Sequence, residues 1–392
     1  MMKRIKILFC INQLEMTGAS VSLLSLLRAL DYSKYDVSLF TFTQHDTLGE
    51  SLPTEVKRLP SVKDYEVYAA PLSAAVRKCL THGWLWLLVR RVVYSVKERF
   101  VGGDHKIRLA ESGPGLTGTY DIAIAFCCSY AWQFIVDKVD ARHHVAWLDT
   151  ERRFVDHQWR RFARPNNWDA VACVGEGIRA NLLSECTEVR DKTYVVHNVI
   201  DRHRIELTLK GAQPVPMAQS GLRIVTVGRV TDAKGQDLII KMAQRLKAKG
   251  VAFDWYLVGP CLEKWNLFMK RAGHPDIEDC LHYCDRSNNP YGWMKGCDLY
   301  VQPSRYEGWG MTVTEALAVG CPVMVSDIPA FREQVRQGEN GWIVPLEVDA
   351  FVDAIINFKD GKLSLTRRGV WLEDYSTAMD FDRMCNKVMG RK

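Results

Sequence analysis

Residues 299–318, LYVQPSRYEGWGMTVTEALA, join an apolar run to a glycine-containing loop and then to a second, amphipathic run. The apolar run Leu299–Gln302 is typical of a buried strand. Gly308 and Gly310 in the loop let backbone amides come close to a ligand. We expect a helix to begin near Thr312. Strand, loop and helix in this order form the repeating unit of parallel α/β sheets, whose ligands bind at the carboxyl ends of the strands.

The same alternation of apolar strands and amphipathic helices runs along the rest of the chain, twice over, and it predicts parallel sheets covered on both faces. The predicted strands are Ile5–Ile11, Val37–Thr43, Asp121–Phe126, His144–Leu148, Ala170–Val174, Tyr194–His197, Arg223–Val227, Trp255–Val258, Leu299–Gln302 and Pro322–Ser326. The clearest predicted helices are Ser20–Leu30, Gly235–Lys249, Thr312–Val319 and Phe381–Met389.

Segment 202–220 loses this rhythm and contains Gly211 and two prolines, so we interpret it as a linker. The sequence therefore predicts two Rossmann-like domains, at residues 1–210 and 218–374. We expect each to be a doubly wound parallel sheet, and the two to face a central cleft. A C-terminal helix at about 375–392 is expected to pack back on the first domain.

Composition excludes several classes of protein. With 392 residues, of which 47% are hydrophobic and 25% charged, the chain is unlike a disordered protein. A net charge of +6, without a basic tract, does not favour a nucleic-acid partner.

The start, Met1–Ile11, is interpreted as a buried strand and not a secretory signal. The twelve cysteines include no C-x-x-C pair, so we expect reduced thiols and a cytoplasmic protein. A metal site at Cys280, His282 and Cys284 is the less favoured alternative to alternating strand residues, and we predict no metal.

A second strand-to-helix junction, Val227–Gly235, carries two cations, Arg229 and Lys234, close to the expected start of a helix. Cations are unfavourable there because the helix dipole is positive at its N-terminus. An anion such as a pyrophosphate, bound between the cations and the helix amides, removes the conflict. The alternative is a solvated basic loop with Asp232 as its counter-charge. The G-x-G-x-x-G fingerprint is absent, which argues against an NAD enzyme.

Two carboxylates, Glu307 and Glu315, follow the strand of the opening stretch. One carboxylate can accept hydrogen bonds from both hydroxyls of a vicinal diol such as ribose, and a second can stabilise a reacting sugar. The alternative is structural. Thr312-x-x-Glu315 fits a capping box at the helix start, and Glu307 could be a turn residue.

The spacing of Glu307 and Glu315, within Pro303-Ser304-x-x-Glu307-Gly308-Trp309-Gly310, resembles the E-x7-E signature of the family-4 retaining glycosyltransferases, which have the two-domain GT-B fold. The order and spacing of the motifs fit this family throughout residues 222–345. The other motifs that carry the resemblance are Gly228-Arg229-x4-Lys234-Gly235, Leu257-Val258-Gly259, Gly320-Cys321-Pro322-Val323-x-x-Ser326 and Gly338-Glu339-Asn340-Gly341.

The resemblance implies that the second domain binds a nucleotide-sugar donor. It implies that Glu307 contacts the donor sugar at the reacting centre and that Glu315 holds the ribose hydroxyls. It also implies retention of anomeric configuration and no obligatory metal or other cofactor, and we take a UDP-sugar as the first donor to test. The residues implied to hold the sugar and phosphates are Arg229, Lys234, and the amides of Gly310, Met311 and Thr312.

The N-terminal half resembles the family less closely. Asn12–Gly18 is similar to the glycine loop near the donor phosphates, but Gly18 follows a threonine where two glycines are usual. Trp147–Glu151 resembles the W-x-H-x-D/E stretch, with Asp149 in place of the frequent histidine. An acidic side chain cannot donate as a neutral imidazole does. Asp149 is therefore a catalytic candidate that contacts sugar hydroxyls or, alternatively, a plain turn residue.

Residues 77–108 hold eight basic and two acidic residues, with aromatic and aliphatic residues interleaved. This composition suits a helix that lies on an anionic lipid surface, and we expect contact through Trp84, Trp86, Arg90 and Arg91. The alternative is an ordinary buried helix whose long basic side chains reach the solvent at its rim. A second basic group consists of Arg152, Arg153, Arg160, Arg161 and Arg164.

The sequence thus predicts a glycosyltransferase in the cytoplasm or at the cytoplasmic face of the membrane. It would transfer a sugar from a nucleotide-sugar donor to a saccharide or lipid-linked acceptor, in polysaccharide or glycoconjugate synthesis. Two alternatives remain open. A sugar-nucleotide epimerase would bind the same donor but consume no acceptor, and a non-catalytic subunit would keep the fold and bind a membrane or a partner protein.

Overall fold

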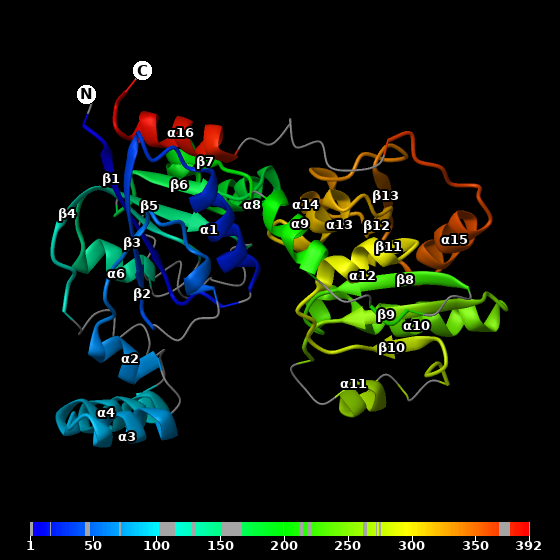
Figure 1. Cartoon of the computed structure of the whole chain (residues 1–392), viewed down its shortest axis with the longest axis horizontal. Helices are drawn as coiled ribbons and strands as arrows, with labels where there is room; N and C mark the ends of the chain where they lie inside the picture. The colour runs from blue at the N-terminus through cyan, green and yellow to red at the C-terminus, as the bar shows by residue number, and fades with distance from the viewer. Residues whose placement is uncertain are drawn as a thin grey trace. The chain divides into compact units, whose positions relative to one another are not determined.

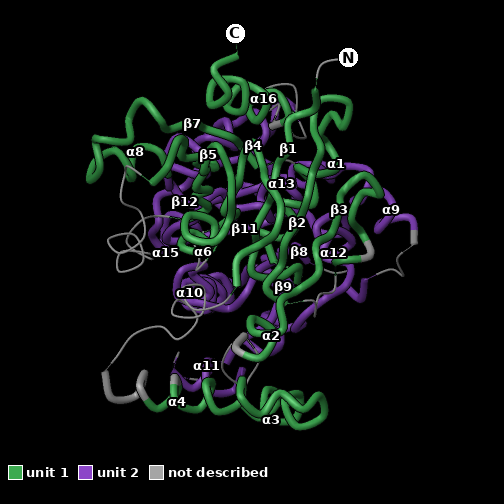
Figure 2. Tube along the Cα trace, turned by 90° about the vertical axis from the view of Figure 1, so that its left-hand side faces the viewer, with its two compact units in different colours: residues 1–174, 178–199, 376–392 green, residues 175–177, 200–375 purple. Residues whose placement is uncertain are grey.

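The computed structural model divides the chain into two compact units, each with its own parallel sheet (Figures 1 and 2). Unit 1 comprises residues 1–174, 178–199 and 376–392, and unit 2 comprises residues 175–177 and 200–375. The structure describes residues 3–15, 17–43, 48–69, 72–101, 114–127, 131–150, 167–198, 200–211, 215–217, 221–261, 265–271, 273, 276–367 and 377–391.

The described strands of unit 1 form a seven-stranded parallel sheet in which β1 is a central strand between β2 and β4. The spatial order is β3 (Lys57–Arg58), β2 (Tyr35–Thr41), β1 (Ile5–Ile11), β4 (Thr119–Ala125), β5 (Asp140–Leu148), β6 (Ala170–Cys173) and β7 (Thr193–Val195). The helices are α1 (Gly18–Ala29), α2 (Lys63–Ala69), α3 (Leu72–Thr81), α4 (Leu85–Val101), α6 (Ala131–Lys138), α8 (Glu176–Glu185) and α16 (Thr377–Val388).

The C-terminal helix α16 packs on the core of unit 1. Phe381 stacks on Phe9 of β1 at a centroid distance of 5.8 Å and meets Trp147 of β5 at 6.5 Å. The carboxylate of Asp382 accepts a 2.8 Å hydrogen bond from the Tyr35 hydroxyl of β2. A buried aromatic and a carboxylate bound to a strand residue therefore join the end of the chain to the N-terminal sheet.

The described strands of unit 2 form a six-stranded parallel sheet with β8 and β11 side by side at its centre. The spatial order is β10 (Leu281–Tyr283), β9 (Phe253–Val258), β8 (Leu222–Val227), β11 (Leu299–Gln302), β12 (Val323–Ser326) and β13 (Gly341–Val344). The helices are α9 (Arg202–Gly211), α10 (Gln236–Ala248), α11 (Trp265–Arg271), α12 (Pro290–Gly296), α13 (Met311–Ala318), α14 (Pro329–Arg332) and α15 (Val348–Lys359).

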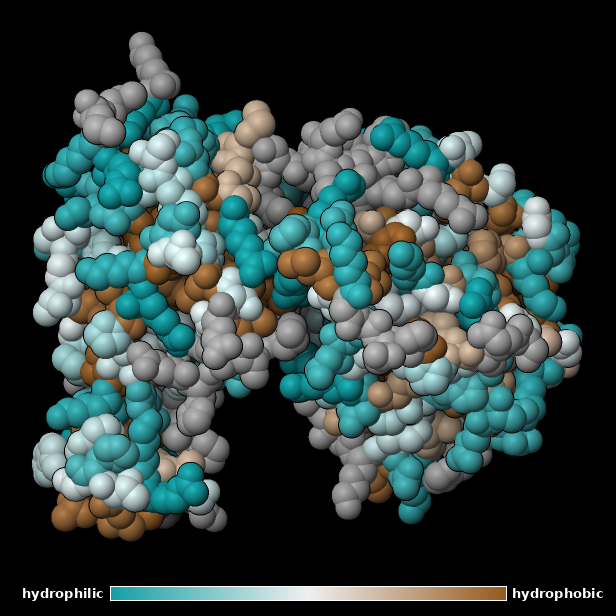
Figure 3. All heavy atoms as spheres, in the orientation of Figure 1, coloured by the Kyte–Doolittle hydropathy of each residue, from teal (hydrophilic) through white to brown (hydrophobic). Residues whose placement is uncertain are grey.

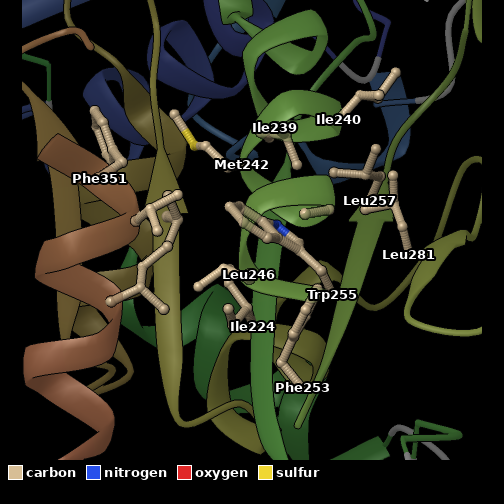
Figure 4. Close-up of a cluster of buried hydrophobic side chains, with 14 of the residues drawn as sticks. Ile224, Ile239, Ile240, Met242, Leu246, Phe253, Trp255, Leu257, Leu281 and Phe351 are labelled. Atoms are coloured by element: carbon tan, nitrogen blue, oxygen red, sulfur yellow. The ribbon is translucent and has the colours of Figure 1, made fainter. Parts of the chain in front are cut away.

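Both faces of the unit 2 sheet are buried, because alternate strand residues enter two separate apolar clusters. Ile224 and Trp255 point into one cluster, under α10 and α15. Figure 4 shows the indole of Trp255 among aliphatic side chains that include Ile239 of α10. Val225 belongs to the other cluster, with α12 and α13. The predicted α/β fold with two parallel, doubly covered sheets is confirmed.

The segment that we interpreted as a linker is in part a helix. Residues 202–211 form α9, which belongs to unit 2, and the change of unit falls at 199–200 rather than near residue 210. The Asp201 carboxylate caps the helix by accepting a 2.9 Å hydrogen bond from the Arg204 amide. Ile205 is buried against the sheet. With one buried apolar anchor among polar residues, α9 gives little periodic signal, which is why the pattern did not reveal it.

Candidate functional site

The strand order of unit 2 defines a topological switch point between β8 and β11. From β8 the chain moves to β9 and β10 on one side of the sheet, and from β11 to β12 and β13 on the other. Open α/β sheets bind ligands at such a point, at the carboxyl ends of the two diverging strands. The loops at these ends are 228–235, after β8, and 303–310, after β11. They carry the cations Arg229 and Lys234 and the carboxylate Glu307.

The first loop is held by backbone geometry and by Gln236. Gly235 has a φ of 73°, and a Cβ there would lie 2.0 Å from the carbonyl oxygen of Pro303, so only glycine fits between the two loops. The buried Gln236 amide donates to the Arg229 carbonyl at 2.9 Å and accepts from the Thr231 amide at 3.2 Å. The Arg229 side chain is exposed beside this fixed backbone. Sequence reasoning missed Gln236, whose role depends on these loop contacts.

Lys234 and Glu307 form an ion pair across the switch point. The Lys234 Nζ lies 2.6 Å from each carboxylate oxygen of Glu307. The Glu307 side chain is 8% exposed and that of Lys234 24%, so the lysine side chain remains partly accessible to solvent. The Ser304 hydroxyl also donates to Glu307 Oε1 at 2.8 Å. A cation and a carboxylate fixed in this way can contact neighbouring groups of one bound ligand, such as a phosphate and a sugar hydroxyl.

A chain of buried polar groups supports Ser304 from the strand below. The Gln302 amide donates to Ser304 Oγ at 2.9 Å, and the Tyr300 hydroxyl donates to Gln302 Oε1 at 2.8 Å. The pKa of Tyr300 is raised, first by burial and then by the charges of Glu307 and Glu315. Both carboxylates therefore lie near the same phenol.

Glu315 does not form the capping box that Thr312 and Glu315 could have made. Helix α13 begins at Met311, and its N-cap is Gly310, in the left-handed region with a φ of 87°. The Glu315 carboxyl group is buried and accepts a 3.1 Å hydrogen bond from the Tyr291 hydroxyl of α12. Burial raises the pKa of Glu315 to about 7, while the Arg204 charge and the Tyr291 hydrogen bond oppose this rise. Glu315 is thus a buried carboxyl group that is fixed by a hydrogen bond from a neighbouring helix.

Two residues behind Glu315 were not predicted. The Arg204 guanidinium of α9 donates to the Tyr291 hydroxyl, which in turn donates to Glu315, so the three side chains form one relay. The Arg204 guanidinium also lies over the Tyr291 ring, 5.8 Å from its centroid. Because the sequence pattern assigned Arg204 to a linker, it could not connect this residue to the site.

The start of α13 is rigid and offers backbone donors. A Cβ on Gly310 would lie 2.6 Å from the Phe331 ring, so the tight packing there also requires glycine. The Trp309 indole donates to the Thr314 hydroxyl at 3.1 Å. The first amides of a helix, here those of Met311 and Thr312, have no acceptor within the helix and carry its positive dipole end. This is a suitable place for an anionic or hydroxyl-bearing ligand group.

An ion pair between Arg305 and Asp237 joins the second loop to the first turn of α10. The two guanidinium nitrogens lie 2.7 Å from the two carboxylate oxygens, and the Arg305 amide donates to the Ala233 carbonyl at 2.8 Å. Such a two-point contact fixes direction as well as distance. The loops are therefore preorganised around Lys234 and Glu307.

Residues 214–369 match the family described as glycosyl transferases group 1. They include both switch-point loops. The chain is also similar to the lipopolysaccharide core biosynthesis mannosyltransferase LpsB of Rhizobium meliloti (strain 1021), with 33% identity over 145 residues. That alignment covers 34% of this chain and only 40% of LpsB, so less than half of the relative is matched.

Two solved structures resemble the whole chain. The lipopolysaccharide outer core galactosyltransferase WaaB, in its apo form, has 17% identity and a TM-score of 0.58, with 98% of each chain covered. Anabaena HepE in complex with UDP-glucose has 17% identity and a TM-score of 0.59, with 99% of each chain covered. At such identities the likeness shows the shared GT-B fold alone.

Unit 1 lies outside the segment that matches the family. Gly18 is the first residue of α1, and the N-cap Thr17 accepts a 3.3 Å hydrogen bond from the Ser20 amide. Asp149 directly follows β5 and is partly buried. Both positions are at carboxyl ends of unit 1 strands. The end of the Trp147–Glu151 motif and the second basic group, Arg152 to Arg164, lie outside the described residues.

Of the four residues predicted to contact a membrane, Trp86 alone is largely exposed. Trp86 is 70% exposed on α4, whereas Arg91 is only 6% exposed and donates to the Ser95 hydroxyl. Arg90 faces Asp64 of α2 at 3.6 Å. Trp84 is partly buried and packs on a neighbouring histidine ring. Arg91 is buried and Arg90 is half-buried beside Asp64, so neither arginine belongs to the most exposed side of α4, and membrane contact through them stays a prediction.

Proposed function

We propose that this protein is a glycosyltransferase that moves a sugar from a nucleotide-sugar donor to a saccharide or lipid-linked acceptor. The observation that carries the proposal is the Lys234–Glu307 pair at the switch point of unit 2, with the buried Glu315 and the first amides of α13 beside it. The match of residues 214–369 to group 1 glycosyl transferases supports it. LpsB and WaaB are both named for lipopolysaccharide synthesis, which supports a role in making a cell-surface polysaccharide.

In the proposed reaction the bond between the anomeric carbon and the diphosphate oxygen breaks, and the acceptor hydroxyl forms the new bond to that carbon. The hydroxyl proton passes to the leaving diphosphate. Lys234 and Arg229, with the amides of Met311 and Thr312, offset the charge that develops on the diphosphate, so no obligatory metal is needed. Glu307 contacts the donor sugar and Glu315 the ribose hydroxyls. We infer retention of configuration from the resemblance to retaining enzymes.

The proposal extends to unit 1 and to the donor. We assign the acceptor side, with the catalytic candidate Asp149, to the carboxyl edge of the unit 1 sheet, and we assign Gly18 to the donor phosphates. HepE was solved with UDP-glucose, which supports a UDP-sugar as the first donor to test. The cysteines of the described residues are free, which fits the cytoplasmic reaction that we propose.

A thermal-shift screen against UDP, GDP, ADP and their sugar conjugates tests the donor site. Saturation at about 100 times the dissociation constant should add roughly 2.7 kcal/mol, which raises the midpoint by a few degrees. Glu315→Ala should reduce the shift, whereas Glu206→Gln, a change of an exposed carboxylate on α9, should not. No shift with any nucleotide would contradict the proposal and favour a non-catalytic subunit. With the bound donor identified, product analysis without acceptor would expose an epimerase.

A further inference from the structure

Exposed large apolar side chains are concentrated on one part of unit 1. The described residues include eleven such side chains, and eight of them lie on α3 and α4. The other three, Leu207, Leu267 and Met379, lie apart from one another in the sequence and on three different helices. The eight are Leu72, Leu80, Leu85, Trp86, Val89, Val92, Val93 and Val96. Scattered single residues are normal on a protein surface, but a contiguous apolar patch indicates a binding surface.

On α4 the exposed residues follow the helical period. They recur at spacings of three and four along residues 85–96, which places them on one stripe of the helix. Leu87 and Arg91, between them in the sequence, are 7% and 6% exposed and lie on the opposite, inner side. Helices α2, α3 and α4 pack together at one end of unit 1, and Figure 3 shows apolar surface gathered at that end. We call this stripe, with Leu72 and Leu80, the α3–α4 apolar face.

Two cations next to the α3–α4 apolar face are paired with acids of α2. Arg90 pairs with Asp64 and Lys78 pairs with Glu66, so α2 neutralises two cations on the inner side. Residues 72–96 contain no aspartate or glutamate. An apolar surface formed by a stretch with basic but no acidic residues suits the interface of an anionic bilayer. A second copy of this surface would bring like charges together, which disfavours a symmetric dimer.

We propose that the α3–α4 apolar face inserts into the surface of an anionic lipid bilayer and holds the protein there. No helix in the described part of the chain is both long and apolar enough to cross a membrane. An apolar stripe along one side of a helix suits contact along the bilayer surface. Insertion depends on the exposed stripe and not on Arg90 or Arg91, which differs from the arrangement expected from the sequence. The proposal does not depend on the transfer reaction, since α3 and α4 belong to unit 1 and the switch point belongs to unit 2.

Flotation of the full chain with vesicles of phosphatidylglycerol and phosphatidylcholine tests the proposal. The triple variant Trp86→Ser/Val89→Ser/Val93→Ser should bind these vesicles on the order of 100-fold more weakly, because three large apolar side chains no longer leave water. The matched control Leu207→Ser/Leu267→Ser removes two equally exposed leucines, each 54% exposed, from unit 2 and should bind like the unchanged protein. Equal binding by the triple variant and the unchanged protein would overturn the proposal.

Two further measurements keep the result interpretable. A UDP-induced thermal shift retained by the triple variant shows that its donor site is intact, so failure of the membrane proposal and failure of the proposed function can be told apart. Brominated lipids should quench part of the tryptophan fluorescence of the unchanged protein, and Trp86→Phe should lose that part while it still floats. The unchanged protein could instead fail to bind vesicles and sediment as a dimer, with the triple variant sedimenting as a monomer. In that case the face is a contact between copies and the proposal is wrong.

Discussion

The buried carboxyl group of Glu315 should make unit 2 less stable as the pH rises from about 5 to about 8. Burial raises its pKa from the ordinary value of 4.5 to about 7. Between these values the folded protein binds more protons than the unfolded chain, so stability falls as the pH increases. The contribution is fully present below a pH of about 4.5 and is lost as the pH rises through about 7. Because a pKa change of one is worth about 1.36 kcal/mol, the whole effect is roughly 3 kcal/mol.

Glu315→Gln isolates this contribution, because its amide keeps the shape of the side chain but does not ionise. The difference in opening free energy between Glu315→Gln and the unchanged protein should grow by roughly 3 kcal/mol over that pH range. Hydrogen exchange of the α13 amides, followed by mass spectrometry, reports the opening of unit 2 without requiring the whole chain to unfold in one step. Glu206→Gln, on the exposed face of α9, is the matched control and should show no such growth.

The Tyr291 hydroxyl, which donates to Glu315, offers a second variant for the same measurement. Tyr291→Phe removes a hydrogen bond that lowers the pKa of Glu315, so the midpoint of the stability change should move to higher pH. A difference between Glu315→Gln and the unchanged protein that stays flat from pH 5 to pH 8 would refute the reasoning. It would mean that the buried carboxyl group ionises at its ordinary pKa.

Two other substitutions test the switch-point loops. Lys234→Ala leaves the carboxylate of Glu307 buried without its cation, so we expect a loss of roughly 3 kcal/mol in urea unfolding and at least about tenfold weaker UDP binding by calorimetry. Unchanged UDP affinity would mean that Lys234 does not bind the donor phosphates. Gly235→Ala would drive a Cβ to 2.0 Å from the Pro303 carbonyl and should cost more than about 2 kcal/mol, whereas Gly250→Ala, with a similar φ of 71° but open space, should cost only about 1 kcal/mol. Equal midpoints for the two glycine variants would contradict the steric argument.

Much of the fold could be predicted because its signals are local. The strands are short apolar runs, and loops with glycine follow them, so the order of strand and helix can be seen without knowledge of tertiary contacts. The switch point follows from that order, since β8 and β11 are the first strands of the two halves of the unit 2 sheet. Lys234 and Glu307, 73 residues apart, are brought to 2.6 Å by this topology.

The remaining features depend on contacts between elements that have no sequence period. Helix α9 is held by Asp201 and by one buried isoleucine, so its polar composition resembles a linker. Arg90 was expected to face lipid because its own helix is basic, but its orientation is determined by Asp64 on α2, a helix outside the pattern. The capping-box interpretation of Glu315 failed for a similar reason, since Gly310 already starts the helix and Tyr291 of α12 binds the carboxyl group.

The two carboxylates of the signature have different surroundings, and these surroundings separate their chemistry. Glu307 has an ammonium at 2.6 Å, so it is held as the charged member of an ion pair. Glu315 accepts a hydrogen bond from the Tyr291 hydroxyl at 3.1 Å, and its burial raises its pKa to about 7. Below that pH its carboxyl group is mostly neutral and can both donate and accept. Pairs of acids with such different environments take different roles in catalytic sites. The spacing of the motif provides both acids, but their surroundings come from other elements. Glu307 has the Lys234 ammonium beside it, whereas burial raises the pKa of Glu315 against the opposing effect of Arg204 and Tyr291.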